Sequence, residues 1–218
     1  ADGNDILTAG DGNNTLFGDG GNDQLTGGSG DDTLKGGTEN DTFRGGAGVN
    51  ELYGEAGNDL FFSASGDDSF DGGEDVDTIN FSEVIALNTN NAGVHSGVTV
   101  DLTNSNGQNV HSSTGTDTFK DIENIVGTQN NDSIKGSNLS NTLQGGEGND
   151  ELDGAQGSDR LEGGLGDDTL QGGTGNFADT LYGNEGNDVF ITSNTSTAVE
   201  LSGDLIDGGT NTTGDNTG

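Results

Sequence analysis

A nine-residue repeat constrains the fold of this chain more than any other feature of its sequence. The clearest copy is Gly27–Lys35, which reads GGSGDDTLK. Eight consecutive units keep one register and begin at Ala9, Gly18, Gly27, Gly36, Gly45, Gly54, Ser63 and Gly72. The period resumes at Gly127 and continues to the unit that begins at Gly183. A repeat this short and regular predicts a solenoid, in which each unit stacks on an equivalent unit further along the chain.

The eighth position of each unit predicts how the units pack. It is apolar throughout, as at Leu25, Leu34 and Phe43, and its neighbours are mostly polar. This pattern predicts a three-residue strand whose central side chain faces inward. Glycine at positions one, two and four allows the tight backbone of a six-residue turn. We therefore expect an all-β fold of stacked parallel sheets.

The composition indicates that such a fold needs a second source of free energy. Only 26% of the 218 residues are hydrophobic, 43 are Gly, and the formal charge is -34. A chain of this kind buries too little apolar surface to offset the entropy of ordering. A hard divalent cation bound by oxygen ligands would supply binding energy and neutralise carboxylates at the same time. The composition therefore predicts a metal-binding protein.

Position six carries the predicted ligands. It is Asp or Asn in every unit, and a turn preference alone is a poor explanation for one residue type at one place in sixteen units. Carboxylates beside bent backbone carbonyls suit Ca²⁺ better than octahedral Mg²⁺, and the near absence of His and Cys disfavours zinc and copper. We predict calcium ligands at Asp5, Asn14, Asp23, Asp32, Asp41, Asn50, Asp59, Asp68, Asp77, Asp132, Asp150, Asp159, Asp168 and Asp188. The units around Asn141 and Asp179 depart from the pattern, and we expect no full site there.

The units resemble the GGxGxDxUx nonapeptide of RTX (repeats-in-toxin) proteins over about two-thirds of the chain. The resemblance implies a right-handed parallel β-roll with two strands and two turns per 18-residue coil. It also implies multiple Ca²⁺ ions bound between alternate turns, type I secretion, and folding on calcium binding outside the cell. Backbone carbonyls would complete the sites at Gly18, Gly21, Gly27, Gly28, Gly30, Gly36, Gly45, Gly48, Gly54, Gly57, Gly145, Gly146, Gly148, Gly154, Gly157, Gly163, Gly164 and Gly166.

In that geometry the first block has two unequal edges. One edge is an unbroken carboxylate column of Asp5, Asp23, Asp41, Asp59 and Asp77. The other alternates amides with carboxylates, and reads Asn14, Asp32, Asn50, Asp68. Because less ligand charge is present on the second edge, we expect tighter calcium binding on the first.

The repeat pattern also divides the chain. We expect a first β-roll block at 1–80 and a second at 127–191. Residues 81–126 form a spacer with longer strands, which we expect to continue the stack and which is similar to the spacers between RTX blocks. Residues 192–218 are a Ser/Thr-rich stretch and the start of a truncated repeat. Since the sequence opens and closes inside repeats, we expect it to be a segment of a longer protein.

These features favour a calcium-binding structural module of a secreted or cell-surface protein. Two alternatives stay open: a rod or lattice segment of an adhesin or S-layer protein, and a non-catalytic module of a secreted enzyme or toxin. We expect no catalysis, since no nucleophile elbow or general base is present. Five scattered basic residues and no long apolar run disfavour nucleic-acid binding and membrane insertion. Self-association, or continuation into further repeats, would cover the open ends of the stack.

Overall fold

The computed structural model describes residues 2–84, 97–111, 115–175, 177–191 and 205–209. Regular structure in this part of the chain is β throughout, and no helix in it could span a membrane. Two compact units form, one from residues 1–94 with 104–124 and the other from 95–103 with 125–218. Most of the expected segment at 192–218 and part of the expected spacer at 81–126 lie outside the described residues.

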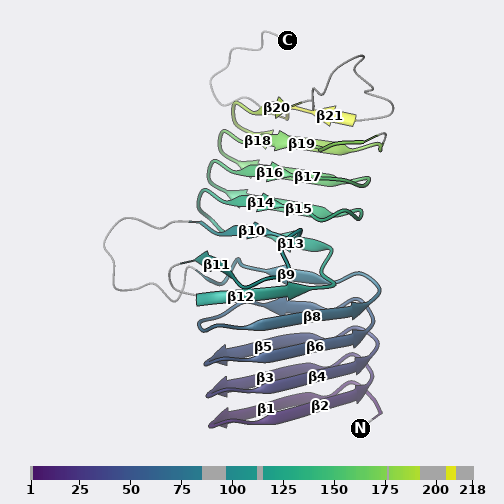
Figure 1. Cartoon of the computed structure of the whole chain (residues 1–218), viewed down its shortest axis with the longest axis vertical. Coiled ribbons are helices and arrows are strands. Elements are labelled where there is room, and N and C mark those ends of the chain that lie inside the picture. The colour runs from purple at the N-terminus through teal and green to yellow at the C-terminus, as the bar shows by residue number, and fades with distance from the viewer. Residues whose placement is uncertain (1, 85–96, 112–114, 176, 192–204, 210–218) are drawn as a thin grey trace, which may run out of the picture. The chain divides into compact units, whose positions relative to one another are not determined.

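The first unit contains two sheets of stacked strands (Figure 1). One has the order β1-β3-β5-β7-β9 and the other β11-β12-β8-β6-β4-β2. The strands are β1 (Ile6–Asp11), β2 (Thr15–Gly20), β3 (Gln24–Ser29), β4 (Thr33–Thr38), β5 (Thr42–Ala47), β6 (Glu51–Ala56), β7 (Leu60–Phe62), β8 (Ser69–Glu74), β9 (Thr78–Asn80), β11 (Gln108–His111) and β12 (Gly115–Lys120). Odd and even repeat units therefore contribute to opposite sheets.

The strand register confirms two repeats per coil. Leu25 lies between Leu7 and Phe43 in parallel ladders, so equivalent residues are 18 apart. Seven strands of the first unit extend further than the expected three residues, from position seven to position three. The reason is that glycines such as Gly28 also pair with the next coil, which confines the turn to positions four to six.

The core of the first unit changes from aliphatic to aromatic along the stack. Leu25 and Leu34 are buried near its start. Further along, Phe43 stacks on Phe61 with ring centroids 4.7 Å apart, and Phe61 meets Phe70 edge to face. The spacer residue Phe119 then stacks on Phe70 at 5.7 Å. The inward column at position eight therefore forms one continuous core, as the repeat pattern predicts.

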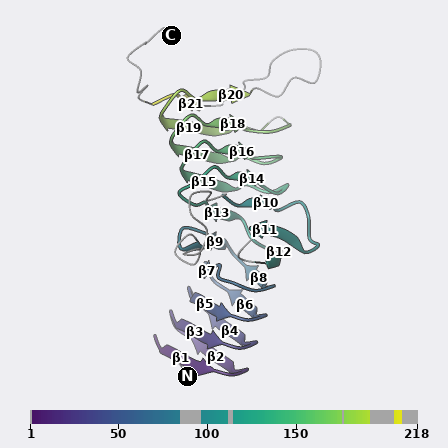
Figure 2. The ribbon, with the colours of Figure 1, turned by 90° about the vertical axis from the view of Figure 1, so that its left-hand side faces the viewer.

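The second unit repeats this plan (Figure 2). Its sheets have the orders β10-β14-β16-β18-β20 and β13-β15-β17-β19-β21. The strands are β10 (Thr99–Asp101), β13 (Asn124–Val126), β14 (Ser133–Lys135), β15 (Thr142–Glu147), β16 (Glu151–Asp153), β17 (Arg160–Leu165), β18 (Thr169–Gln171), β19 (Thr180–Glu185), β20 (Val189–Ile191) and β21 (Leu205–Asp207). Arg160 pairs with Thr180, a spacing of 20, so the turn before β19 absorbs two extra residues without shifting the register.

Candidate metal centre

The position-six carboxylates lie inside the coils because each follows a tight turn and precedes an inward-facing core residue. Asp41, Asp59 and Asp77 are buried although they border exposed turn residues. The preceding glycine at position one also faces inward, because position eight and position one alternate with outward residues along the strand. Each turn therefore directs a carboxylate toward glycine backbone.

One oxygen of each carboxylate joins successive coils through a hydrogen bond. The backbone N–H of Asp23 donates to Asp41 Oδ1 at 2.7 Å, and that of Asp41 donates to Asp59 Oδ1 at 2.7 Å. The N–H of Asp59 donates to Asp77 Oδ1 at 2.8 Å. On the second edge, the backbone N–H of Asn14 likewise donates to Asp32 Oδ1 at 2.8 Å. Each edge is therefore a ladder in which a side chain supports the turn 18 residues earlier.

The other carboxylate oxygen is buried without a hydrogen-bond partner in many of these turns. The described residues with such an Oδ2 are Asp23, Asp32, Asp41, Asp59, Asp77, Asp117, Asp150, Asp159, Asp168 and Asp188. A buried, unpaired carboxylate oxygen is costly, and columns of them at the strand spacing of about 4.8 Å repel one another. A cation bound beside these oxygens would offset both costs.

The glycine at position one forms a cradle with these oxygens. A Cβ placed on Gly18 would collide with Asp23 Oδ2 and would stand 2.6 Å from the carbonyl oxygen of Gly36, in the next coil of the same edge. In the second unit, Gly145 repeats this arrangement with Asp150 Oδ2 and, at 2.7 Å, the carbonyl oxygen of Gly163. A carboxylate and a carbonyl from successive coils thus converge where only glycine leaves space.

This donor set fits a hard cation. Among the described residues no three acidic, His or Cys side chains gather at one point, so backbone carbonyls must provide part of any metal's coordination. Mixed carboxylate and carbonyl oxygens are the ligands that Ca²⁺ prefers. The geometry therefore supports calcium between successive coils.

Comparison with protein families supports the same assignment. The family model described as the RTX calcium-binding nonapeptide repeat matches residues 1–34, 26–61, 35–70, 62–82, 126–161, 136–170 and 162–194. The chain belongs to the RTX calcium-binding nonapeptide repeat family. A search of curated proteins gave no match.

The predicted RTX ligand residues fall into four columns, two in each unit. In the first unit the structure aligns Asp5, Asp23, Asp41, Asp59 and Asp77 on one edge, and Asn14, Asp32, Asn50 and Asp68 on the other. In the second unit it aligns Asp132, Asp150, Asp168 and Asp188. Asp159 forms the other column with Asn141 and Asp179, two positions at which we expected no full site. The position-one glycines face these columns, and the position-four glycines, such as Gly30 and Gly148, pack against the turn one coil earlier.

The amide positions of the RTX repeats differ from the carboxylate positions. The Nδ2 of Asn50 donates to Asp68 Oδ1 at 3.0 Å and to the Gly46 carbonyl at 3.4 Å. The Nδ2 of Asn50, a hydrogen-bond donor, therefore occupies the position that the partnerless Oδ2 occupies in the Asp turns. At Asn141, Oδ1 instead accepts the backbone N–H of Ser137 at 2.7 Å. In both turns the amide is hydrogen-bonded within the protein, that of Asn50 to the next coil and that of Asn141 to Ser137 of its own turn. We therefore keep the expectation of weaker calcium binding at these turns.

Two polar features escaped prediction from the repeat. Position-five side chains form a second ladder on the turns, in which Asn22 Oδ1 accepts the N–H of Asn40 and Asn40 Oδ1 that of Asn58, at 3.0 and 2.9 Å. The recurrence of Asn or Asp at position five was the sequence signal that could have predicted this ladder.

The second unpredicted feature is Asp117 in the spacer, whose carboxylate joins the column of Asp68. The nine-residue period does not extend to Asp117, so the repeat pattern could not predict its place in the column.

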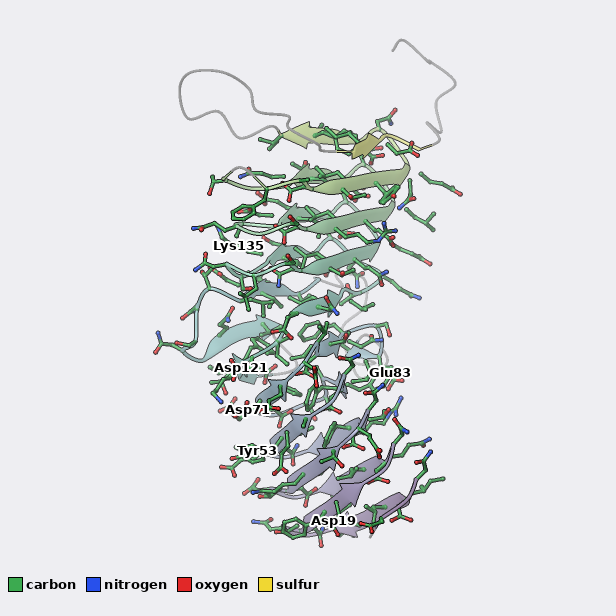
Figure 3. All side chains as sticks on the ribbon, turned by 90° about the vertical axis from the view of Figure 1, so that its right-hand side faces the viewer. Asp19, Tyr53, Asp71, Glu83, Asp121 and Lys135 are labelled. Atoms are coloured by element: carbon green, nitrogen blue, oxygen red, sulfur yellow. The ribbon has the colours of Figure 1, made fainter. Side chains whose placement is uncertain are left out.

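The basic residues stay on the outer surface and cannot neutralise the columns. They stack on or pair with outward side chains, as in Lys35 with Tyr53, Arg44 with Glu83, Lys120 with Asp71, Lys135 with Asp153 and Arg160 with Glu162 (Figure 3). The basic residues, although scattered in the sequence, thus all interact with side chains on the outer surface. These outward pairs place no basic side chain beside the partnerless Oδ2 atoms of residues such as Asp41 and Asp59.

Burial shifts the acidity of the column carboxylates. Desolvation raises the pKa of Asp59 and Asp77 to about 7, and that of Asp117 to about 8. A backbone hydrogen bond opposes this rise, and neighbouring carboxylates, such as Asp77 beside Asp59, add to it. The pKa also rises to about 7 for Asp150 and Asp159, and to about 6 for Asp41, Asp68 and Asp168.

These shifts predict opposite pH dependence with and without calcium. In the metal-free fold, Asp59 binds a proton below about pH 7, whereas its ordinary pKa is 3.8. The folded state then holds more protons than the unfolded state, so acid stabilises the metal-free fold across this range. With calcium bound, protons compete for the ligands and acid destabilises the fold. Without calcium, the far-UV circular dichroism signal of β-structure should therefore increase as the pH falls from about 8 to 4.5, whereas with calcium the melting temperature should fall over the same range. The same direction in both series would contradict this account.

Proposed function

We propose that this chain is a calcium-loaded structural module of a secreted protein, and that it folds when calcium enters the turns. The observation that carries the proposal is the set of buried Oδ2 oxygens without partners, each beside glycine backbone and the next coil. Because no cradle exists until two coils are stacked, the free energy of calcium binding is also free energy of folding.

The proposed ligands are the position-six carboxylates and the carbonyls of the position-one to position-four glycines. Bound calcium would neutralise the columns and hold successive coils together. The protein itself orients the ligands: the hydrogen bonds to Oδ1 hold each carboxylate in place, and the absence of a side chain at the position-one glycine leaves space for the ion. The described residues supply shape and ligands, which supports a non-catalytic role.

The proposed location outside the cell follows from the expected affinity. Extracellular calcium modules bind at about 10⁻⁴ to 10⁻³ M, far above the free calcium of a cytosol. A chain that needs such concentrations would stay unfolded during type I secretion and fold afterwards.

The division of the chain is part of the same proposal. We assign the blocks at 1–80 and 127–191 to calcium-binding rolls and residues 81–126 to the sheets of both. Strand β12 pairs with β8 of the first unit, and β10 pairs with β14 of the second, which supports this assignment.

A calcium titration tests the function. We expect the far-UV circular dichroism signal of β-structure to develop with a midpoint at about 10⁻⁴ to 10⁻³ M calcium. Magnesium at the same concentrations should produce little change, because the mixed carboxylate and carbonyl sites do not impose a strict octahedron. A midpoint below about 10⁻⁶ M would contradict the export proposal, since such a chain would fold before secretion.

A further inference from the structure

The spacer contains a segment that occupies repeat positions although its sequence spacing is irregular. Thr118, Phe119 and Lys120 pair in parallel with Ser69, Phe70 and Asp71, which lie 49 residues earlier instead of 18. These spacer residues therefore stand at positions seven, eight and nine of a coil. The family match skips them, since it ends at residue 82 and resumes at 126.

The residues before this strand reproduce a repeat turn. Gly115 has a φ of 95°, like the position-four glycines. The N–H of Thr116 donates to Asp67 Oδ1 at 2.9 Å, which is the bond of the position-five ladder. The N–H of Asp68 donates to Asp117 Oδ1 at 3.0 Å, which is the bond of the position-six ladder. Residues 115–120 therefore behave as positions four to nine of a repeat.

The residues after the strand close the last cradle of the other edge. A Cβ on Gly72 would collide with both Asp77 Oδ2 and the carbonyl oxygen of Asp121. Gly54 has the same surroundings one coil earlier, with Asp59 Oδ2 and the carbonyl oxygen of Gly72. The Asp121 carbonyl thus takes the role of a position-one glycine carbonyl.

Glu123 takes the place of the position-six aspartate in the same coil. Its Oε2 accepts the N–H of Asp77 at 2.9 Å, as Asp77 Oδ1 accepts that of Asp59 at 2.8 Å. The N–H of Asn124 then donates to the Asp77 carbonyl at 2.9 Å, as that of Thr78 donates to Asp59. Glu123 follows Asp117 by six positions in the sequence, where successive position-six residues of the repeat are nine apart. The extra methylene of glutamate lets its carboxylate reach Asp77 from this shorter turn.

Two fully buried oxygens indicate that the segment faces cations. Asp77 and Asp117 are each 0% exposed, and the Oδ2 of each has no hydrogen-bond partner. We infer that residues 115–123 form a shortened repeat that completes the last calcium sites of the first unit. Asp77 Oδ2, the Asp121 carbonyl and the Glu123 carboxylate supply ligands on one edge, and Asp117 extends the other. This inference rests on the proposed calcium binding.

Glu123→Gln in the full chain tests the inference. It retains an acceptor for the Asp77 N–H but removes the negative charge. We expect native mass spectrometry to count one calcium ion fewer than in the unaltered chain at the same free calcium, while most β-structure remains. Asp117→Asn should also lose calcium, and provides a second test if Glu123→Gln does not fold.

Glu83→Gln is the matched control. The Glu83 side chain is 53% exposed and pairs with Arg44 at 3.0 Å on the outer surface (Figure 3). This variant makes the same substitution and removes the same charge as Glu123→Gln, but at a residue outside the carboxylate columns. Its calcium count should therefore match that of the unaltered chain.

The outcomes separate the two proposals. Unchanged calcium number and affinity in Glu123→Gln would overturn the shortened repeat, and so would an equal loss in Glu83→Gln, which would assign the effect to net charge. If the unaltered chain itself binds no calcium, the proposed function fails instead.

Discussion

Removal of calcium is expected to unfold both units of this chain. With 26% hydrophobic residues and a formal charge of -34, the fold has little apolar burial to oppose the repulsion within its carboxylate columns. Excess chelator should therefore replace the β-sheet circular dichroism spectrum with that of a coil and increase the hydrodynamic radius. Restoring calcium should reverse both changes.

The control for this experiment is chelator already saturated with calcium, which should leave the spectrum unchanged. Size-exclusion chromatography of the same samples separates expansion from aggregation. A chain that keeps its parallel β-structure and compact size in excess free chelator would contradict calcium-dependent folding.

Asp59→Asn is expected to cause the largest loss among single changes in the columns. Asp59 is buried in the middle of the unbroken edge, and its Oδ2 has no partner. Asparagine would keep the acceptor for the Asp41 N–H but would place a hydrogen-bond donor in the cradle, as Asn50 does on the other edge. Because the carboxylate faces two successive coils, we expect calcium affinity to fall by about tenfold or more. Isothermal titration calorimetry measures the change.

Asn50→Asp should act in the opposite direction and strengthen calcium binding, because it converts the mixed edge toward an unbroken carboxylate column.

Asp31→Asn is the matched control for Asp59→Asn, since it removes the same negative charge from an exposed position-five residue. Asparagine at that position, as at Asn22 and Asn40, still accepts the inter-coil N–H. Equal affinity changes in Asp59→Asn and Asp31→Asn would indicate that net charge, and not ligand position, governs binding.

The repeat register made the fold and the carboxylate columns predictable from sequence. A period of nine fixes which side chains face inward, and the coil of two repeats that the RTX resemblance implies assigned Asp41 and Asp59 to one edge. The alternation of Asn and Asp also made the unequal edges predictable. Both features recur in every repeat unit, which is why the sequence pattern could predict them.

Features that depend on irregular spacing could not be predicted. Asp117 enters its column through strand pairing across a 49-residue gap, and no period in the sequence connects it to Asp68. The longer strands arise from glycine backbone pairing, which leaves no side-chain pattern. The amide hydrogen bonds of Asn50 and Asn141 depend on rotamers and neighbours that the repeat motif does not specify.

The central claim is that calcium lies between successive coils, beside the buried Oδ2 oxygens. Anomalous diffraction from crystals grown in calcium measures this directly. The account predicts calcium peaks within about 2.3 to 2.6 Å of Asp41, Asp59 and Asp77 Oδ2. Well-ordered turns with no cation at that distance from these oxygens, in crystals supplied with calcium, would contradict it.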